Sequence, residues 1–452
     1  MIWLKPLVVT LFIAAGATNH RGDDGEPKAA STIACPNGLT AEATDWPWWR
    51  GPTLDGHARG PAPPTQWNET KNIRWRTKVP GRGHASPCVV GESVFIATAE
   101  GAEGETKTRK GITIVSASGK GEVQSLICYD RASGKQLWQT DLHHGGFLSR
   151  HAKNSHATPT PACDGERVYC VFANHDKVWL SAVGLAGEIV WQKEVGPITG
   201  RYGYGASPLL FQSLVVVNVD HPGGGAISAF DRKTGKRVWQ SPRDKWYGFA
   251  SPVAANLDGR PQILQSGVRQ LTSYDPESGK VLWACPAPSN TLASTPVVGE
   301  NRVFVTGGDP ETGIHGIRVK SEGNGDRLQA DLLWQNSTKV YVPSSLLIDG
   351  RLLAIKDLGV AVCFDAATGE KLWEERLGGE FSASPVVCDG LVFVPNEAGK
   401  MFVFRPTPKF ERVAENDLAD GGFASPVIAN GSLYLRTLGW LYRIGDARQD
   451  TR

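Results

Sequence analysis

Net charge and long apolar runs are both nearly missing from this chain. Its 48 lysines and arginines and 46 aspartates and glutamates leave a formal net charge of +2 over 452 residues. Such a balance creates no basic field that would attract nucleic acid or anionic lipid. After the N-terminal segment there is no apolar run of about 18 residues, the length typical of a membrane-spanning helix. We therefore expect no nucleic-acid partner and no transmembrane helix.

The cysteine patterns that hold zinc or haem are missing too. The eight cysteines include no CxxC, no CxxCH and no adjacent pair, so zinc-ribbon and c-type haem sites have no support. Most of the cysteines lie in apolar runs, and we interpret these as small buried residues. Cys163 and Cys170 flank the turn sequence DGER. In an oxidising compartment they are the best candidates for a disulfide across a hairpin.

The N-terminal residues predict export. Lys5 precedes an apolar run from Leu7 to Ala17, which has the length of a signal-peptide core and is too short to span a bilayer. We predict a signal peptide over residues 1–17, a flexible linker over 18–44 and a C-terminal tail over 447–452. The protein is then periplasmic or extracellular. If the signal segment is not cleaved, it anchors the protein to the membrane.

Glycine and tryptophan are plentiful, with 52 and 15 residues, and both belong to a repeated motif. Four segments follow the pattern D-x-x-[ST]-G-[KE]-x-x-W, starting at Asp130, Asp231, Asp275 and Asp365. The aspartate closes a turn onto backbone N–H groups, and the glycine takes the left-handed conformation. The strand that follows alternates, so its tryptophan faces a core. We predict a hairpin corner with an aromatic plug, and we assign structural docking to Trp75, Trp138, Trp191, Trp239, Trp283, Trp334 and Trp373.

A second repeated unit, here called the SP unit, precedes each corner. It consists of a small residue, Ser or Thr, Pro, an apolar pair, a turn and a strand. It occurs eight times, with markers at Pro87, Pro161, Pro208, Pro252, Pro296, Ser345, Pro385 and Pro426. The spacing lies in the forties except after Pro87, where an insertion lengthens it. A period of about 40–50 residues built from short strands is typical of β-propellers.

The two ends of the repeat region complement one another. NIRWRTK (72–78) carries a tryptophan without an SP unit, whereas the last SP unit (424–435) has no tryptophan corner after it. An N-terminal strand that completes the last blade would hide two sheet edges. We therefore predict an all-β fold over residues 45–446: an eight-bladed β-propeller of four-stranded antiparallel blades, closed by the N-terminal strand.

The corner motif together with the SP units resembles the PQQ-repeat, or quinoprotein-type, propellers. That superfamily includes quinoprotein alcohol dehydrogenases and the assembly factor BamB. The resemblance covers about residues 45–446, and WPWWRGPTLDG (46–56) with GRGHASP, YVPSS and FSASP further resembles secreted BamB-like and PQQ-binding-like propellers of bacteria. It implies eight blades with each tryptophan docked between neighbours. We expect WPWW (46–49) to pack on the outer or bottom face of the ring.

Three classes of function follow from the resemblance. The first is a non-catalytic, exported binding or scaffold module, similar to BamB, that acts on protein partners at the cell envelope as a monomer. The second is a PQQ-dependent dehydrogenase for alcohols or sugars. Those enzymes use calcium, a catalytic aspartate and usually a vicinal disulfide, and no residues here match that set, so we expect no catalytic residue, no metal and no cofactor. The third is a sensor that binds a small molecule or polysaccharide.

A ligand, if there is one, is expected at the mouth of the central channel, where the segments before the SP units end. Arginine, histidine and aromatic groups there suit an anionic planar ligand, of which PQQ is one. The alternative is that they fill the mouth and bond loop carbonyls. The candidate ligand-binding residues are Arg82, His84, Asn154, His156, Arg201, Tyr202, Tyr204, Trp246, Tyr247, Tyr341, Lys356 and Asp357.

Overall fold

The structure, a computed structural model, describes residues 32–35, 37–322, 327–418 and 420–446. The predicted signal peptide, the first part of the predicted linker and the C-terminal tail lie outside the described residues. The described part of the chain is built from strands and contains no helix. Accordingly, none of its elements is an apolar helix of membrane-spanning length.

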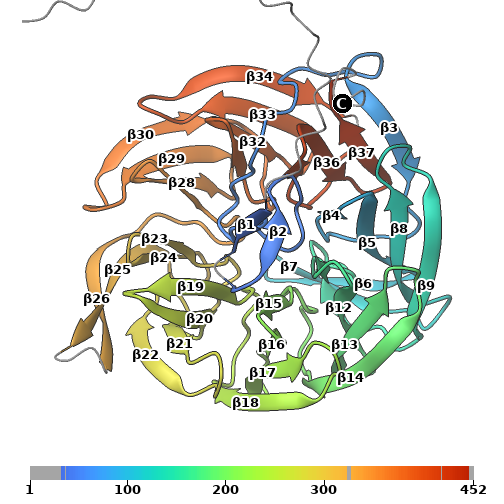
Figure 1. Ribbon diagram of the computed structural model, residues 1–452, viewed down its shortest axis with the longest axis horizontal. Coiled ribbons are helices and arrows are strands. Elements are labelled where there is room, and N and C mark those ends of the chain that lie inside the picture. Colours follow the sequence, from blue (N-terminus) through green and yellow to red (C-terminus); the bar gives the residue numbers. More distant parts are fainter. Residues whose placement is uncertain (1–31, 36, 323–326, 419, 447–452) are drawn as a thin grey trace, which may run out of the picture.

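Eight antiparallel sheets of four strands surround a central axis, with the strands of each sheet following one another outward (Figure 1). We number them 1 to 8 in chain order. Sheets 1 to 4 are β4 (Cys88–Val90), β5 (Ser93–Glu100), β8 (Val123–Asp130) and β9 (Gln136–His144); β11 (Ala162–Cys163), β12 (Arg167–Asn174), β13 (Lys177–Gly184) and β14 (Ile189–Pro197); β15 (Leu209–Phe211), β16 (Leu214–Val219), β17 (Gly225–Asp231) and β18 (Arg237–Arg243); and β19 (Val253–Leu257), β20 (Arg260–Gly267), β21 (Gln270–Tyr274) and β22 (Val281–Pro286).

The remaining four-stranded sheets complete the ring. Sheets 5 to 8 are β23 (Val297–Gly299), β24 (Arg302–Gly307), β25 (Gly313–Glu322) and β26 (Arg327–Asn336); β27 (Leu346–Ile348), β28 (Arg351–Lys356), β29 (Val360–Asp365) and β30 (Lys371–Arg376); β31 (Val386–Cys388), β32 (Leu391–Pro395), β33 (Lys400–Arg405) and β34 (Glu411–Asp417); and β35 (Val427–Ala429), β36 (Ser432–Arg436), β37 (Trp440–Ile444) and β3 (Ile73–Lys78). The all-β propeller fold predicted from the repeats is confirmed.

Sheet 8 joins the two ends of the repeat region. β3 pairs antiparallel with β37, with Ile73 opposite Ile444 and Lys78 opposite Trp440. The strand from the N-terminal side is therefore the outermost strand of the last sheet. This is the closure that the incomplete first and last repeats predict, and it leaves neither strand edge unpaired at the junction.

The tryptophan corners connect neighbouring sheets at the outer part of the ring. Six of the seven docking tryptophans donate their indole N–H to a corner carbonyl of the next sheet. The acceptors are the carbonyls of Arg131 (3.1 Å, Trp75), Leu185 (2.9 Å, Trp138), Arg232 (3.1 Å, Trp191), Pro276 (2.8 Å, Trp239), Ala366 (3.1 Å, Trp334) and Pro406 (3.0 Å, Trp373). Trp283 instead donates to Gln262 Oε1 within its own sheet at 2.6 Å.

The corner glycine is required by this contact. Gly279 has φ +70°, and a Cβ built there would lie 2.5 Å from Cε3 of Trp239. The ring therefore sits directly on the glycine, and the same holds for Trp75 on Gly134 and Trp191 on Gly235. The glycine of the motif serves more than the turn: it admits the left-handed conformation and also leaves room for the neighbouring sheet's indole.

The SP units connect neighbouring sheets near the axis. The hydroxyl of the Ser or Thr before a marker residue accepts the backbone N–H of its counterpart in the preceding sheet. Six such bonds of 2.8–3.1 Å link Ser86 to Thr160, Thr160 to Ser207, Ser207 to Ser251, Thr295 to Ser344, Ser344 to Ser384 and Ser384 to Ser425. We call this set the hydroxyl ring. It explains why a hydroxyl residue recurs at that position.

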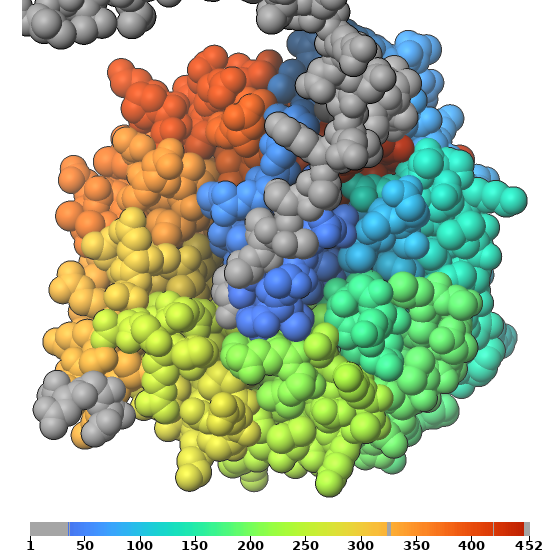
Figure 2. All heavy atoms as spheres, in the orientation of Figure 1, coloured from blue at the N-terminus to red at the C-terminus, as the bar shows by residue number. Residues whose placement is uncertain are grey.

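The N-terminal residues lie across the axis rather than forming only a tether. β1 (Thr32–Ala34) and β2 (Thr40–Glu42) pair with each other, and Cys35 and Asn37 are buried. Figure 2 shows this blue segment over the middle of the face in view. The predicted linker over 18–44 is therefore structured at residues 32–35 and 37–44, where Cys35 packs in the core cluster and the Asn37 carbonyl accepts the N–H of Gln212 at 2.8 Å.

The WPWW segment packs against the inner strands. Trp46 exchanges two backbone hydrogen bonds with Val89 of β4, and the Pro47 carbonyl accepts the N–H of Cys163 in β11 at 2.8 Å. Trp46 and Trp48 are each only 2 % exposed. The outer-face option predicted for WPWW is wrong, since these aromatics meet inner strands of sheets 1 and 2.

Arg50 extends this contact to the opposite side of the ring. Its guanidinium donates to the carbonyls of Pro385 at 2.9 Å and Ser345 at 2.7 Å, which precede the inner strands of sheets 7 and 6. Trp49 donates to the Thr295 hydroxyl of sheet 5 at 2.8 Å. One short segment thus bonds to five sheets, which ties the centre of the ring together.

All eight cysteines are buried and none forms a disulfide within the described residues, so the predicted disulfide between Cys163 and Cys170 is wrong. The turn pairs Cys163 with Val168, which places Cys170 two residues further along β12. Burial raises the pKa of the Cys163 thiol to about 12. The interpretation of these residues as small buried groups fits the structure better.

Candidate functional site

The loops before the inner strands meet at one end of the ring, which we call the ring mouth. Loops far apart in sequence touch there. Lys153, before sheet 2, bonds Glu380 at 2.5 Å and Glu397 at 3.0 Å, both in loops of sheet 7. His84, before sheet 1, stacks on Phe423, before sheet 8, with ring centroids 4.4 Å apart. The mouth is therefore spanned by side chains of the chain itself.

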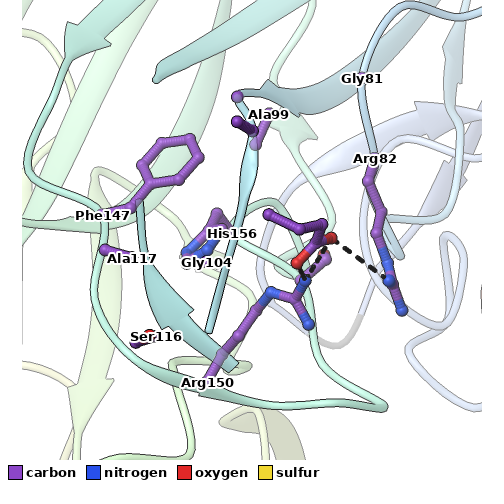
Figure 3. A pocket seen from close by; sticks show the side chains of 13 residues that line it. Gly81, Arg82, Ala99, Gly104, Ser116, Ala117, Phe147, Arg150 and His156 are labelled. Atoms are coloured by element: carbon purple, nitrogen blue, oxygen red, sulfur yellow. Dashed lines mark hydrogen bonds and ion pairs between the residues drawn. The ribbon is translucent and has the colours of Figure 1, made fainter. Parts of the chain in front are cut away.

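Four of the predicted residues, Arg82, His84, Asn154 and His156, lie together beside the insertion within sheet 1. The insertion supplies β6 (Glu103–Arg109) and β7 (Ile112–Ala117), and β10 (Arg150–His151), from the segment before sheet 2, pairs with β7 to complete a three-stranded sheet. A cavity of about 150 Å³ opens between it and the ring, lined among others by Arg82, Glu103, Arg150 and His156. We call this the basic pocket. Figure 3 shows Arg82 and Arg150 approaching it from two different segments.

One carboxylate joins the two arginines of the basic pocket. Nη2 of Arg150 donates to both carboxylate oxygens of Glu103 at 2.6 Å. Nη1 of Arg82 lies 3.7 Å from Glu103 Oε1, and its Nη2 donates to the Ala152 carbonyl at 3.0 Å. Arg150 and Glu103 were not among the predicted residues. Glu103 lies in the insertion, which lacks the repeat pattern. Arg150 lies in the segment before the second SP unit, so the positional signal that located Asn154 was available for it too.

The two histidines at the basic pocket are neutral at pH 7. Burial lowers the pKa of His84 well below its ordinary range, and Arg82, Arg436 and Arg150 lower it further. Burial also lowers the pKa of His156 to about 3, with Arg150 and Arg82 acting in the same direction. The His156 ring stacks on Phe147 at 4.0 Å. The histidines therefore contribute polar, uncharged groups, and the positive charge of the pocket comes from arginine.

Four other predicted residues form an aromatic patch beside the basic pocket: Arg201, Tyr202, Trp246 and Tyr247. Tyr202 and Tyr247 meet edge to face at 4.7 Å, and Trp246 lies 6.0 Å from Tyr247. The Arg201 guanidinium lies 5.5 Å over the Tyr202 ring. Trp246 is 42 % exposed. Asn154 links the patch to the pocket, because its side-chain amide donates to the Tyr202 carbonyl at 2.8 Å.

The remaining predicted residues serve the ring itself. Tyr204 is buried and donates to the Asn218 carbonyl at 2.8 Å. The Asp357 carboxylate accepts the backbone N–H groups of Tyr341 and Val342 at 2.8 and 3.1 Å. Burial raises the pKa of Asp357 even though these bonds oppose the shift. These contacts match the alternative in which mouth residues bond loop backbone.

Lys356 also points to a structural partner. Its ammonium group bonds Glu374 of the same sheet at 2.8 Å. Lys356 and Glu374 stand on β28 and β30, outer positions relative to the inner strand β27. The structure therefore does not bring Lys356 into a common site with the arginines of the basic pocket.

A calcium site of the kind that accompanies PQQ is not built at the mouth. Throughout the ranges that the structure describes, no three His, Cys, Asp or Glu side chains are grouped as a metal ion requires. Asp357, the acidic residue among the candidates, uses its oxygens to accept backbone N–H groups. The residues present do not fit the calcium–PQQ pair, so no chemical step is derived through it.

Comparison with known proteins decides the family. A family model described as outer membrane protein assembly factor BamB matches residues 103–218, 223–328 and 324–407, together more than half of the chain. The chain belongs to the BamB family. The resemblance to PQQ-repeat, BamB-like propellers that the repeats predict is thereby confirmed. The matched residues include Glu103 and Arg150.

Individual members of the family are distant in sequence. The outer membrane protein assembly factor BamB of Burkholderia pseudomallei is 23 % identical over 382 residues, which cover 77 % of this chain and 92 % of that protein. The crystal structure of BamB from Moraxella catarrhalis aligns with a TM-score of 0.52 at 15 % identity, covering 77 % of this chain and 98 % of that one. A quinohemoprotein alcohol dehydrogenase from Pseudomonas putida gives a TM-score of 0.52 at 12 % identity, covering 91 % and 81 %. At these identities the solved structures show the fold.

Proposed function

We propose that this chain is a non-catalytic, exported scaffold propeller that binds protein partners in outer membrane protein assembly at the cell envelope. The family match over residues 103–407 carries the proposal, because it rests on the sequence of most of the ring. The function named by the family description concerns assembly of other proteins, which calls for contact surfaces. We further propose that the chain acts as a monomer, without a cofactor, in the periplasm or outside the cell.

The aromatic patch is the surface that best suits a protein partner. Tyrosine, tryptophan and arginine are the residue types enriched at the centres of protein interfaces. Trp246 offers a large exposed ring, and its indole N–H is held by the Thr291 hydroxyl at 3.1 Å. Because the neighbouring aromatics hold Trp246 in place, a partner would lose little side-chain entropy on binding to it.

Deletion and complementation in the native host test the proposal. We expect deletion of the gene to lower the amount of folded outer-membrane β-barrel proteins, measured by heat-modifiable mobility on gels, and the wild-type gene to restore it. The double variant Arg201→Glu, Trp246→Ala should fold but fail to restore the amount of folded β-barrel proteins. Val238→Ser, which changes an exposed apolar residue on β18, is the matched control and should restore them. Unchanged β-barrel levels after deletion would overturn the proposal.

The dehydrogenase alternative has its own readout. The purified chain is mixed with PQQ and calcium, and thermal unfolding and dye-linked oxidation of alcohols and sugars are measured. We expect no shift and no turnover. A stabilised protein that reduces the dye would replace the scaffold proposal, since a ligand that binds only the folded state raises the unfolding temperature. A shift without turnover would support a sensor instead.

A further inference from the structure

The basic pocket holds more positive charge than its own carboxylate can balance. Arg82 and Arg150 line it, Arg436 lies near enough to act on the neighbouring His84, and the acidic partner of the first two is Glu103. The two histidines are neutral and leave that excess unchanged. Glu122 also lies near the insertion, but its carboxylate accepts the backbone N–H groups of Gly119 and Phe147 at 2.7 and 2.9 Å. A concentration of buried cations of this kind favours an anion.

Arg150 has hydrogen-bonding capacity left over. Its side chain is 2 % exposed, yet its Nε has no hydrogen-bond partner. Nη1 donates to the carbonyl of Asn154 at 3.0 Å, and Nη2 is taken by Glu103. An unpaired donor in a buried guanidinium is costly, so a bound acceptor at this position would relieve it. Arg150 also lines the cavity, where the carboxylate of Glu103 covers its Nη2.

Arg436 adds a further buried cation behind His84. It is 1 % exposed, and its contacts with Ala97, Thr98 and Thr437 are all uncharged and 3.3–3.5 Å long. Burial lowers the pKa of Arg436 to about 10, and the opposing influence comes from the phenol of Tyr129 rather than from a carboxylate. The positive potential of this region is therefore not neutralised locally.

The dimensions of the cavity set the size of the ligand. A volume of about 150 Å³ corresponds to about five water molecules at roughly 30 Å³ each. A carboxylate or a phosphate group fits such a space. The carboxylate of Glu103 already shows how an oxyanion sits on Arg150, with both oxygens 2.6 Å from Nη2.

We propose that the basic pocket is a binding site for a small oxyanion, a carboxylate or phosphate group, which competes with Glu103 for Arg150 and Arg82. Glu103 stands on β6, and its side chain is 56 % exposed. It can therefore swing out while the buried Arg150 stays in place. The site shares no lining residue with the neighbouring aromatic patch, so it goes beyond the scaffold function.

Titration calorimetry of the full mature chain tests the proposal. Sodium phosphate and sodium succinate are the probes, at constant ionic strength set with sodium chloride. We expect wild-type protein to bind one of them and Glu103→Gln to bind it about tenfold or more tightly, because the competing charge-assisted bonds are gone. A stronger response to phosphate identifies a phosphate group, and a stronger response to succinate identifies a carboxylate.

Three variants control the experiment. Glu105→Gln lies on the same hairpin, pairs with Lys107 in solvent, and should bind like wild type. Arg150→Gln should abolish binding, and Arg82→Gln, at a partly exposed position, should weaken it even if Arg150→Gln fails to fold. The proposal is overturned if Glu103→Gln binds neither probe, or if Arg82→Gln and Glu105→Gln behave alike. These results are independent of β-barrel assembly.

Discussion

Replacing the corner glycine of sheet 4 isolates what a docked tryptophan contributes to the ring. In Gly279→Ala the new Cβ meets the Trp239 ring at 2.5 Å, at a position with φ +70°. Sheet 4 also contains Gly259, with φ +75° and no atom within 4 Å of the place that a Cβ would take. Gly259→Ala is therefore a matched control with the same substitution and the same backbone conformation, but without the neighbouring indole.

The expected effects differ by the cost of displacing the ring. Left-handed backbone costs an alanine about 1–2 kcal/mol at either site. At Gly279 overpacking adds about 1–3 kcal/mol, and loss of the 2.8 Å bond from Trp239 to the Pro276 carbonyl adds about 1 kcal/mol. We expect Gly279→Ala to lower the free energy of unfolding by about 3–6 kcal/mol, against about 1–2 kcal/mol for Gly259→Ala.

Urea unfolding followed by tryptophan fluorescence and far-ultraviolet circular dichroism measures both values, and agreement of the two probes checks two-state behaviour. In a Trp239→Leu background the excess cost of Gly279→Ala should shrink toward that of Gly259→Ala. Equal destabilisation by the two alanine variants in the wild-type background would refute the docking argument.

Three further changes test other contacts. Ser207→Ala removes the hydroxyl that accepts the Thr160 N–H at 2.9 Å, and we expect a loss of about 1–3 kcal/mol in thermal unfolding. Hydrogen bonds from Thr234 lower the pKa of Asp231 below its ordinary 3.8. The ionised Asp231 therefore stabilises the folded state above pH 3.8, and this contribution is lost as the pH falls below that value. The difference in unfolding free energy between wild type and Asp231→Asn should accordingly narrow in acid unfolding curves. Lys153→Met should change stability by less than about 1 kcal/mol, since Lys153 and Glu380 are half exposed and Glu397 keeps its bond from Ser382. It should speed amide exchange in residues 147–156, and unchanged exchange would contradict the bridging role.

The fold could be predicted from the sequence because the motifs that indicate it are short and local. The turn, glycine and tryptophan of each corner lie within nine positions, and each SP unit is equally short. The purpose of the SP hydroxyl was not accessible, because Ser207 serves Thr160 of another sheet. The N-terminal segment was misplaced for the same reason: the partners of Trp46 and Arg50 are inner strands far along the chain.

Only part of the candidate site could be predicted from the sequence. Arg82, His84 and His156 lie next to SP units, so the repeat itself located them. Glu103 lies in an insertion that follows no repeat, and Arg150 lies in the segment before the second SP unit. Only the folded sheet of β6, β7 and β10 brings them to the same cavity. The basic pocket therefore forms between the sheet of β6, β7 and β10, which does not follow the repeat, and the ring, which does.

The pairing of β3 with β37 also fixes the order in which the protein can be completed. Ile73 can pair with Ile444 only after Ile444 has been synthesised, and the ribosome adds Ile444 after the strands of the other seven sheets. Contacts between such distant positions form slowly, because a long loop must be closed first. Until then the ring is an open arc with two bare strand edges, which are prone to join other chains. A nascent chain that stops before β37 therefore cannot finish the molecule, and we expect closure of the ring to be the last step of its assembly.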